Sequence, residues 1–308
     1  MITQAGIAVT GSVVRVTGSG LGCPTWPQCF PGSLVPQPNP EVAALHQWIE
    51  FGNRLLTGLV GLVGLACLVV ALLVRPRRRR LVLLAATMPV GVVVQAVLGG
   101  VTVLTGLTWW AVAVHFLVSM VLVWLAVLLV AAFGEGDAPP RWQLPGPLRG
   151  LLYTATAVLA ALLIAGTLVT AAGPHAGNAA TPRLAAGVPA LVHLHADLLV
   201  GFLGLLTGLG FALRAVGVPG RVWRRYPVLI CVVLAQGTLG IAQYLTGVPD
   251  VLVSLHVLGA TSVVVAMAAL WTSCRVRDEL PALSVGAARP LTSAGATRSR
   301  TGFVTGGS

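Results

Sequence analysis

The stretch QAVLGGVTVLTG (95–106) recurs in the second half of the chain as QGTLGIAQYLTG (236–247). Both copies read Q-x-x-L-G-x-x-x-x-L-T-G, and a histidine, His115 or His256, follows nine residues after the last glycine of each. The spacing from glutamine to histidine is therefore 20 residues in both copies. Agreement over this length is not expected by chance, so the pattern predicts an internal duplication.

The residues around both copies are almost unbrokenly apolar. The chain is 56% hydrophobic and 9% charged, whereas soluble domains carry about 25% charged residues. Apolar runs of about 20 residues cross a bilayer as helices, because lipid cannot satisfy unpaired backbone groups. The prediction is an all-α integral membrane protein. Its eight transmembrane helices are expected at residues 1–15, 46–74, 81–104, 111–133, 150–172, 191–216, 226–246 and 251–273.

The duplication predicts two tandem four-helix bundles, related by an axis along the membrane normal because four helices separate equivalent positions. The N-terminal bundle is expected at 1–133, with an outer cysteine loop at 16–45, and the C-terminal bundle at 150–273. A Pro-rich cytoplasmic linker at 134–149 and a disordered cytoplasmic tail at 274–308 complete the chain. The first apolar run is short for a span, so the first helix is either truncated, with its start upstream, or short and tilted.

The basic residues are distributed in a regular way. All 19 are arginine, and 16 of them lie at 75–80, 134–149, 214–225 or after residue 273, which are alternate loops. The positive-inside rule places these loops and the C-terminus in the cytoplasm, and the cysteine loop outside. The net charge of +11 is thereby explained by membrane topology, so contact with lipid is expected and contact with nucleic acid is not.

Three histidines lie at similar depth, each about five residues into its predicted helix: His115, His195 and His256. Ionisable groups inside a membrane are rare and usually functional. Neutral imidazole is a frequent haem ligand, and four-helix bundles commonly hold cofactors. His195 and His256 are therefore predicted to be the axial ligands of one haem. His193 is the alternative to His195, because residues two apart on a helix point about 200° apart.

In the first half, the partner of His115 is expected on the second helix. Glu50 and Asn53 are three residues apart there and share one helix face. A carboxylate in this apolar run suits a proton acceptor or donor, although Glu50 could instead pair with Arg54 or lie at the water interface. His46, one turn earlier, is a supporting or peripheral candidate.

These segments together resemble haem A synthases of the actinobacterial type. The likeness covers nearly the whole chain and is carried by VTGSGLGCPTWPQC (16–29), IEFGNRLLTG (49–58), LHADLL (194–199) and the two repeats with their histidines. The resemblance implies a multi-pass protein of the bacterial cell membrane. It also implies an oxidoreductase acting on a CH group, which oxidises the C8 methyl of haem O to the formyl group of haem A for cytochrome c oxidase. Haem O synthase and oxidase assembly are then the expected partners, and a homo-oligomer stays open.

The resemblance also implies site residues. Haem b would be held by His195 and His256, and substrate haem O would lie in the N-terminal half, where Glu50 and His115 match the family motifs. One position departs: the family's Glu-x-x-His-Arg has Asn53 in place of its histidine. The substrate haem would then be five-coordinate on His115, or bound by His46 instead, or activity would be lost.

Cys23 and Cys29 can pair on the oxidising outer side, and they match the family's two outer cysteines. The disulfide would be either redox-active above the substrate haem or a structural clamp, and the spacing does not decide between these two roles.

Two other functions compete with the synthase. A bis-His membrane cytochrome b would carry electrons without modifying haem. A transporter is disfavoured, because the polar groups cluster near one face rather than at the midplane.

Overall fold

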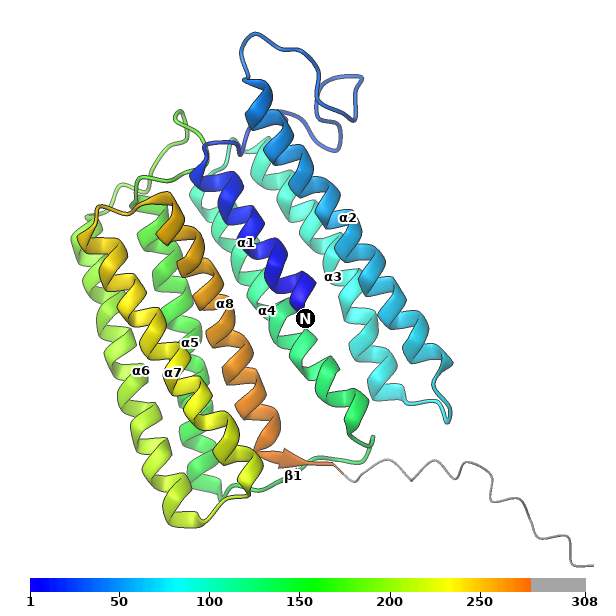
Figure 1. The fold of residues 1–308 in the computed structure, drawn as a ribbon, viewed down its shortest axis with the longest axis vertical. Coiled ribbons are helices and arrows are strands. Elements are labelled where there is room, and N and C mark those ends of the chain that lie inside the picture. The colour runs from blue at the N-terminus through cyan, green and yellow to red at the C-terminus, as the bar shows by residue number, and fades with distance from the viewer. Residues whose placement is uncertain (278–308) are drawn as a thin grey trace, which may run out of the picture.

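The structure is a computed structural model that describes residues 1–277. Within that range the chain forms eight α-helices that run side by side, and two short strands (Figure 1). The helices are α1 (Ile2–Val16), α2 (Ala44–Leu73), α3 (Arg79–Leu104), α4 (Trp109–Gly134), α5 (Gly146–Ala172), α6 (Val188–Val216), α7 (Gly220–Leu245) and α8 (Asp250–Ser273). The strands are β1 (Arg141–Trp142) and β2 (Arg275–Val276).

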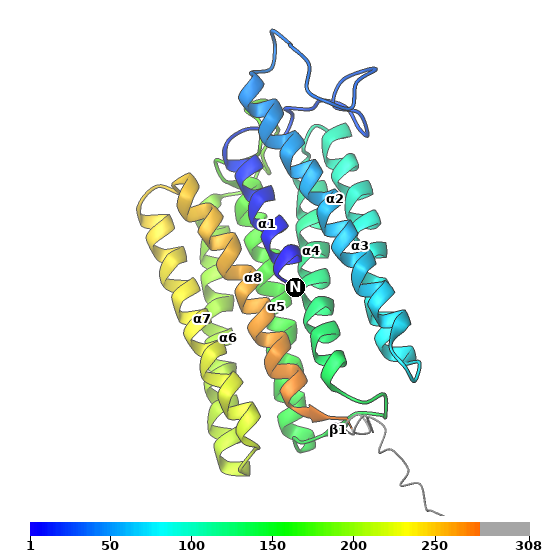
Figure 2. The ribbon, with the colours of Figure 1, turned by 45° about the vertical axis from the view of Figure 1, so that its right-hand side comes forward.

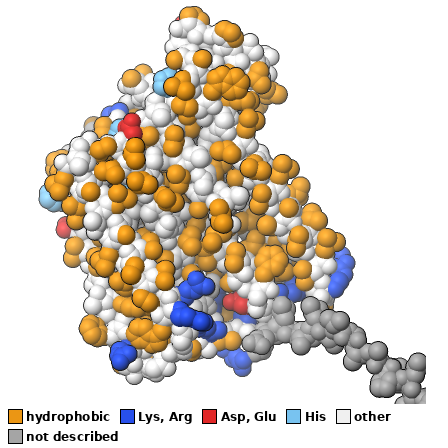
Figure 3. Space-filling view, viewed as in Figure 1, with side chains coloured by type: hydrophobic (Ala, Val, Ile, Leu, Met, Phe, Trp, Pro, Cys, Tyr) orange, Lys and Arg blue, Asp and Glu red, His pale blue; other side chains and the backbone are white. Residues whose placement is uncertain are grey.

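Seven of the helices, α2 to α8, are long and apolar enough to cross a membrane. Even the shortest of them, with 24 residues, extends about 36 Å and exceeds a hydrocarbon core of about 30 Å. The side chains over the middle of the molecule are mostly hydrophobic, and the charged ones gather toward its ends (Figure 3). The predicted all-helical, multi-pass membrane protein is confirmed. The first of the eight expected spans, at residues 1–15, forms α1. This helix has 15 residues and would extend only about 22 Å.

Helix α1 joins the two halves of the molecule. It packs against α8 more extensively than against α2 or α4, although α2 and α4 belong to its own predicted bundle. Figures 1 and 2 show it between α8 on one side and α2 on the other. Helix α4 also packs along α8, where Met120 and Val123 contact Val264 in a small buried cluster. The two halves therefore meet where α1 and α4 pack against α8 and where α4 also packs against α5.

Each half has its own hydrophobic core. In the C-terminal half, fully buried side chains line α6, among them Phe202 and Leu206, and they pack with Leu152 on α5 and Met267 on α8. The N-terminal core is smaller and consists mainly of α3 and α4 residues with Ala71 on α2. Branched and aromatic side chains thus pack α5 to α8 together, whereas small residues allow α2, α3 and α4 to approach closely.

The segment between the halves is not only a linker. Its residues Arg141–Trp142 form β1, which pairs antiparallel with β2 in the register Arg141↔Val276 and Trp142↔Arg275. The backbone N–H of Gln143 donates to the carbonyl of Cys274, 3.0 Å away. Residues 274–277, predicted to begin a disordered tail, are therefore hydrogen-bonded to the linker. The rest of the predicted tail, 278–308, lies outside the described residues.

Candidate functional site

Two histidines face each other in the C-terminal half. His195 on α6 and His256 on α8 have ring centroids 6.4 Å apart, with an angle of 56° between the ring planes. Each lies about two turns into a helix that begins at the end of the bundle carrying the cysteine loop. His193, the alternative to His195, is exposed. The structure thus brings His195 and His256 together and leaves His193 on the outer face of α6.

Backbone and glycine contacts hold the two rings in place. His195 Nδ1 lies 3.1 Å from the carbonyl oxygen of Leu162 on α5. A carbonyl only accepts, so the proton sits on Nδ1 and Nε2 keeps its lone pair. Glycines make room for both rings: a Cβ at Gly166 would lie 3.1 Å from His195 Cε1, and a Cβ at Gly240 would lie 3.1 Å from His256 Cε1. Larger residues at these positions would push the rings away.

The repeated motif has the same contacts in both halves. Its glutamine donates from Nε2 to the backbone carbonyl of the histidine 20 residues later, at 3.1 Å for Gln95 and 2.9 Å for Gln236. Its first glycine lies against the histidine ring, since a Cβ at Gly99 would be 3.4 Å from His115 Cε1. The sequence pattern therefore encodes a contact between two adjacent helices, α3 with α4 and α7 with α8. Sequence reasoning found the histidines but missed the roles of the glutamine and glycine.

The N-terminal half lacks a second histidine facing His115 from α2. Asn53 accepts a hydrogen bond at Oδ1 from the Thr10 hydroxyl on α1, at 2.7 Å. No hydrogen bond joins Asn53 to His115 in the described part of the chain. His46 lies in the first turn of α2, where its Nδ1 is 2.8 Å from the Ser19 hydroxyl. His46 is therefore tied to the cysteine loop.

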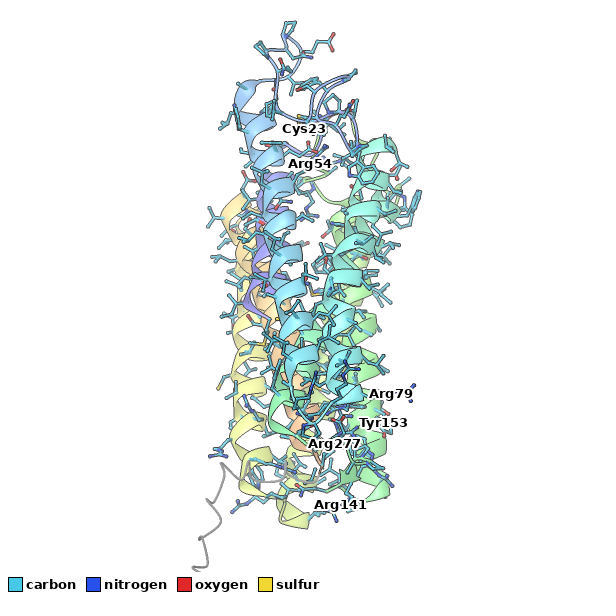
Figure 4. The ribbon with its side chains drawn as sticks, turned by 90° about the vertical axis from the view of Figure 1, so that its right-hand side faces the viewer. Cys23, Arg54, Arg79, Arg141, Tyr153 and Arg277 are labelled. Atoms are coloured by element: carbon cyan, nitrogen blue, oxygen red, sulfur yellow. A yellow bond between two sulfur atoms is a disulfide. The ribbon has the colours of Figure 1, made fainter. Side chains whose placement is uncertain are left out.

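Glu50 binds the cysteine loop, which covers residues 17–43 between α1 and α2. Its Oε1 pairs with Arg54 Nη2 at 2.6 Å, and its Oε2 accepts from the Cys23 backbone N–H at 2.8 Å. Arg54 in turn donates to the carbonyl oxygens of Cys23, Thr25 and Gln28. Figure 4 shows Cys23 and Arg54 together at this end of the bundle. The sequence left open whether Glu50 pairs with Arg54 or lies at the water interface, and in the structure it pairs with Arg54.

The disulfide closes the same loop. Cys23 and Cys29 are bonded to each other, as predicted, and both are fully buried. The loop also reaches α3, because the Trp26 indole occupies the space where a Cβ at Gly100 would come within 2.6 Å of the ring. Gly100 is adjacent to Gly99, which contacts His115. The cysteine loop is thus fixed to α2 by hydrogen bonds to Glu50 and Arg54, and it covers α3 beside the His115 site.

The fold and this site define a class: a multi-pass helical membrane protein with one histidine-bearing helix hairpin in each half and a disulfide-closed loop at one end. The family model described as "Cytochrome oxidase assembly protein" matches residues 1–268, and the chain belongs to that family.

Curated relatives named "Heme A synthase" are similar over part of their length. The one from Alkalihalophilus pseudofirmus is 31% identical over 158 residues, which is 50% of this chain and 51% of the relative. The one from Symbiobacterium thermophilum is 36% identical over 128 residues, covering 41% and 40% of the two chains. The chain thus spans about half the length of the curated relatives it matches. No solved structure matches it.

Proposed function

We propose that this protein is a haem A synthase, which oxidises a methyl group of haem O to the formyl group of haem A. The proposal combines membership of the cytochrome oxidase assembly family with the names of its curated relatives. We further propose that the two halves are duplicated four-helix units, 1–133 and 150–273, joined by 134–149. The cysteine loop would face outward and the arginine-rich end the cytoplasm.

The separation of His195 and His256 is the observation that carries the proposal. An iron held by two imidazoles needs ring centres about 6 Å apart, from two iron–nitrogen bonds of about 2 Å and about 1 Å from each nitrogen to its ring centre. The observed distance is 6.4 Å. A second observation agrees, because the hydrogen bond from His195 Nδ1 to the Leu162 carbonyl leaves Nε2 of that ring free to bind a metal. These side chains fit haem b as a resident cofactor, which would supply electron transfer when bound.

Substrate haem O is assigned to the N-terminal half. His115 would hold its iron there, oriented by Gln95 through the His115 carbonyl and by the close approach of Gly99. The Asn53 side-chain oxygen already accepts a hydrogen bond from Thr10, and an amide is a weak iron ligand compared with imidazole. The substrate iron would therefore have one protein ligand and one open position.

Glu50 would act beneath the cysteine loop, next to the proposed haem O site. Its carboxylate accepts from the Cys23 N–H and pairs with Arg54, so it holds the loop close to the disulfide. We assign it the handling of protons at the reacting methyl. Two successive two-electron oxidations of that methyl, with water as the oxygen source, would give a gem-diol that loses water to form the aldehyde, and an external electron acceptor would take the four electrons released. The disulfide would serve as a structural clamp that holds the cysteine loop in this conformation.

The test is pigment analysis in a host that makes haem O and lacks its own haem A synthase. Membranes containing the wild-type protein should yield haem A on chromatography, and those with His256→Ala should not. His193→Ala is the matched control, because His193 is exposed on the same helix as His195, and it should retain haem A formation. A wild-type protein that is haem-loaded, folded and yet forms no haem A would refute the proposal.

The same experiment separates the synthase from an electron-carrying cytochrome b. Glu50→Gln keeps an oxygen that can accept from the Cys23 N–H and removes the charge. If Glu50 handles protons, this variant should lose haem A formation while its two-histidine haem spectrum stays unchanged. An electron carrier would have that spectrum in the wild type and the variant alike, and neither would make haem A.

A further inference from the structure

A cavity lies at the arginine-rich end of the bundle, far from the paired histidines. Its volume is about 520 Å³, within the range typical of ligand sites. It lies where the two halves meet, between α3 and α4 of the first half and the chain that follows α8. It is lined by Arg79, Arg80, Leu83, Leu84, Thr87, Leu128, Asp137, Arg275 and Arg277. Figure 4 shows Arg79 and Arg277 at this end, opposite Cys23.

Positive charge exceeds negative charge around the cavity. Glu135 pairs with Arg80 at 3.0 Å and lies 3.8 Å from Arg277 Nε. Asp137 pairs with Arg78, also at 3.0 Å, and Arg78 lies beneath the cavity, buried against the end of α4. Both nearby carboxylates are therefore already engaged.

Two of the lining arginines have no such partner. The guanidinium groups of Arg79 and Arg275 make no hydrogen bond or ion pair with any residue from 1 to 277. The Nε of Arg275 is buried and unsatisfied. Burial lowers the pKa of Arg275, Glu135 raises it, and Arg80 and Arg277 lower it again. An anion between Arg79 and Arg275 would satisfy these donors and offset the repulsion among the arginines.

The rest of the wall is apolar and lies at the membrane boundary. Leu83 and Leu84 on α3 and Leu128 on α4 continue from the cavity toward the middle of the bundle. Next to the cavity, four aromatic rings pack mostly edge to face, with one tilted pair: Trp124, Trp142, Tyr153 and Trp271. Trp142 pairs with Arg275 in the β1–β2 ladder. Tryptophan and tyrosine are enriched at the headgroup level of membranes, so we expect the arginines to lie at the level of the lipid phosphates.

We propose that this cavity binds an anionic membrane phospholipid, with its phosphate between Arg79 and Arg275 and an acyl chain along Leu83 and Leu128. Basic pockets between transmembrane helices on the arginine-rich side are the kind of site that holds such headgroups. The lipid would bridge α3 of the first half to β2 of the second. The proposal requires only that the chain spans a membrane, and it does not depend on the haem chemistry.

The test uses the full-length protein, purified in detergent and titrated with four probes: cardiolipin, phosphatidylglycerol, phosphatidylcholine and inorganic phosphate. Thermal unfolding and retained lipid in native mass spectrometry are the two readouts. The variant is Arg79→Gln with Arg275→Gln, and Arg79→Gln alone tests a side chain that is exposed at the rim. Arg77→Gln is the matched control, because Arg77 is exposed in the same arginine run and does not line the cavity.

The anionic lipids should stabilise the wild type and Arg77→Gln at the same concentration. Each lining arginine removed should weaken binding about tenfold, since a hydrogen bond to a charged group contributes on the order of 1.5 kcal/mol. The double variant should then require about 100-fold more lipid. Equal responses of the wild type and the double variant would overturn the proposal. So would a full response to inorganic phosphate or to phosphatidylcholine, which would indicate a free-anion site or unspecific lipid solvation.

Discussion

Gly240→Ala tests whether glycine contacts position the histidine that we assign to haem b. The new methyl would lie 3.1 Å from His256 Cε1, whereas carbon atoms in contact prefer about 3.5–4.0 Å. The ring must therefore shift by about 0.5 Å, or α7 and α8 must separate. Overpacking of this kind costs about 1–3 kcal/mol, and replacing a helical glycine by alanine returns about 1 kcal/mol. The protein should therefore still fold, but the His256 ring should be displaced from its position as a haem ligand.

Haem content is the measurement that separates these effects. A displaced ligand or supporting contact typically costs 10- to 100-fold in metal affinity, so purified Gly240→Ala should lose most of its haem b while its unfolding temperature changes little. Gly99→Ala is a graded comparison, because its Cβ would be 3.4 Å from His115, an ordinary contact. Gly204→Ala is the control, since nothing lies within 4 Å of its Cβ, and it should keep its haem and gain about 0.5–1 kcal/mol. Equal haem content in Gly240→Ala and Gly204→Ala would refute the reasoning.

Three other predictions concern groups outside the haem b pair. Arg54→Met leaves the Glu50 carboxylate buried without its partner, so it should destabilise the protein by about 3 kcal/mol and make the cysteine loop sensitive to protease. Arg75→Met, at an exposed arginine, should have neither effect. A cysteine loop that stays resistant to protease in Arg54→Met would contradict the role of Arg54 in holding it. Asn53→His should add a second low-spin, two-imidazole haem signal in absorption and paramagnetic resonance spectra, and unchanged spectra would show that position 53 does not face the substrate iron. Burial raises the pKa of the Cys274 thiol to about 11, so at pH 8 its thiolate is about 200-fold scarcer than that of an exposed cysteine, whose pKa is about 8.5. Its alkylation rate, followed by mass spectrometry, should rise tenfold per pH unit to about pH 11, and a plateau near pH 9 would contradict the buried thiol.

The sequence alone determined the features that depend on local pattern. Uncharged apolar runs longer than a bilayer predict helices wherever they occur, because lipid leaves the backbone no other way to satisfy its hydrogen bonds. The repeated spacing of glutamine, glycine and histidine placed His115 and His256 at matching positions in the chain. The disulfide between Cys23 and Cys29 followed from two thiols close together on the side predicted to be oxidising.

Only the tertiary structure decided which of these groups meet. The sequence left Glu50 free to be a proton carrier or the ion-pair partner of Arg54 on the same helix, and only the folded loop brought the Cys23 N–H, 27 residues away, to its carboxylate. Arg78 was predicted only as one of the arginines of the cytoplasmic loop at 75–80, yet it is buried against Asp137, 59 residues away. Helix α1 packs on α8 as extensively as on α2 and α4 together, a contact between the halves that the sequence did not indicate. Hydropathy and spacing describe neighbours along the chain, whereas these contacts join segments far apart in it, and their free energy depends on side-chain packing that no local pattern records.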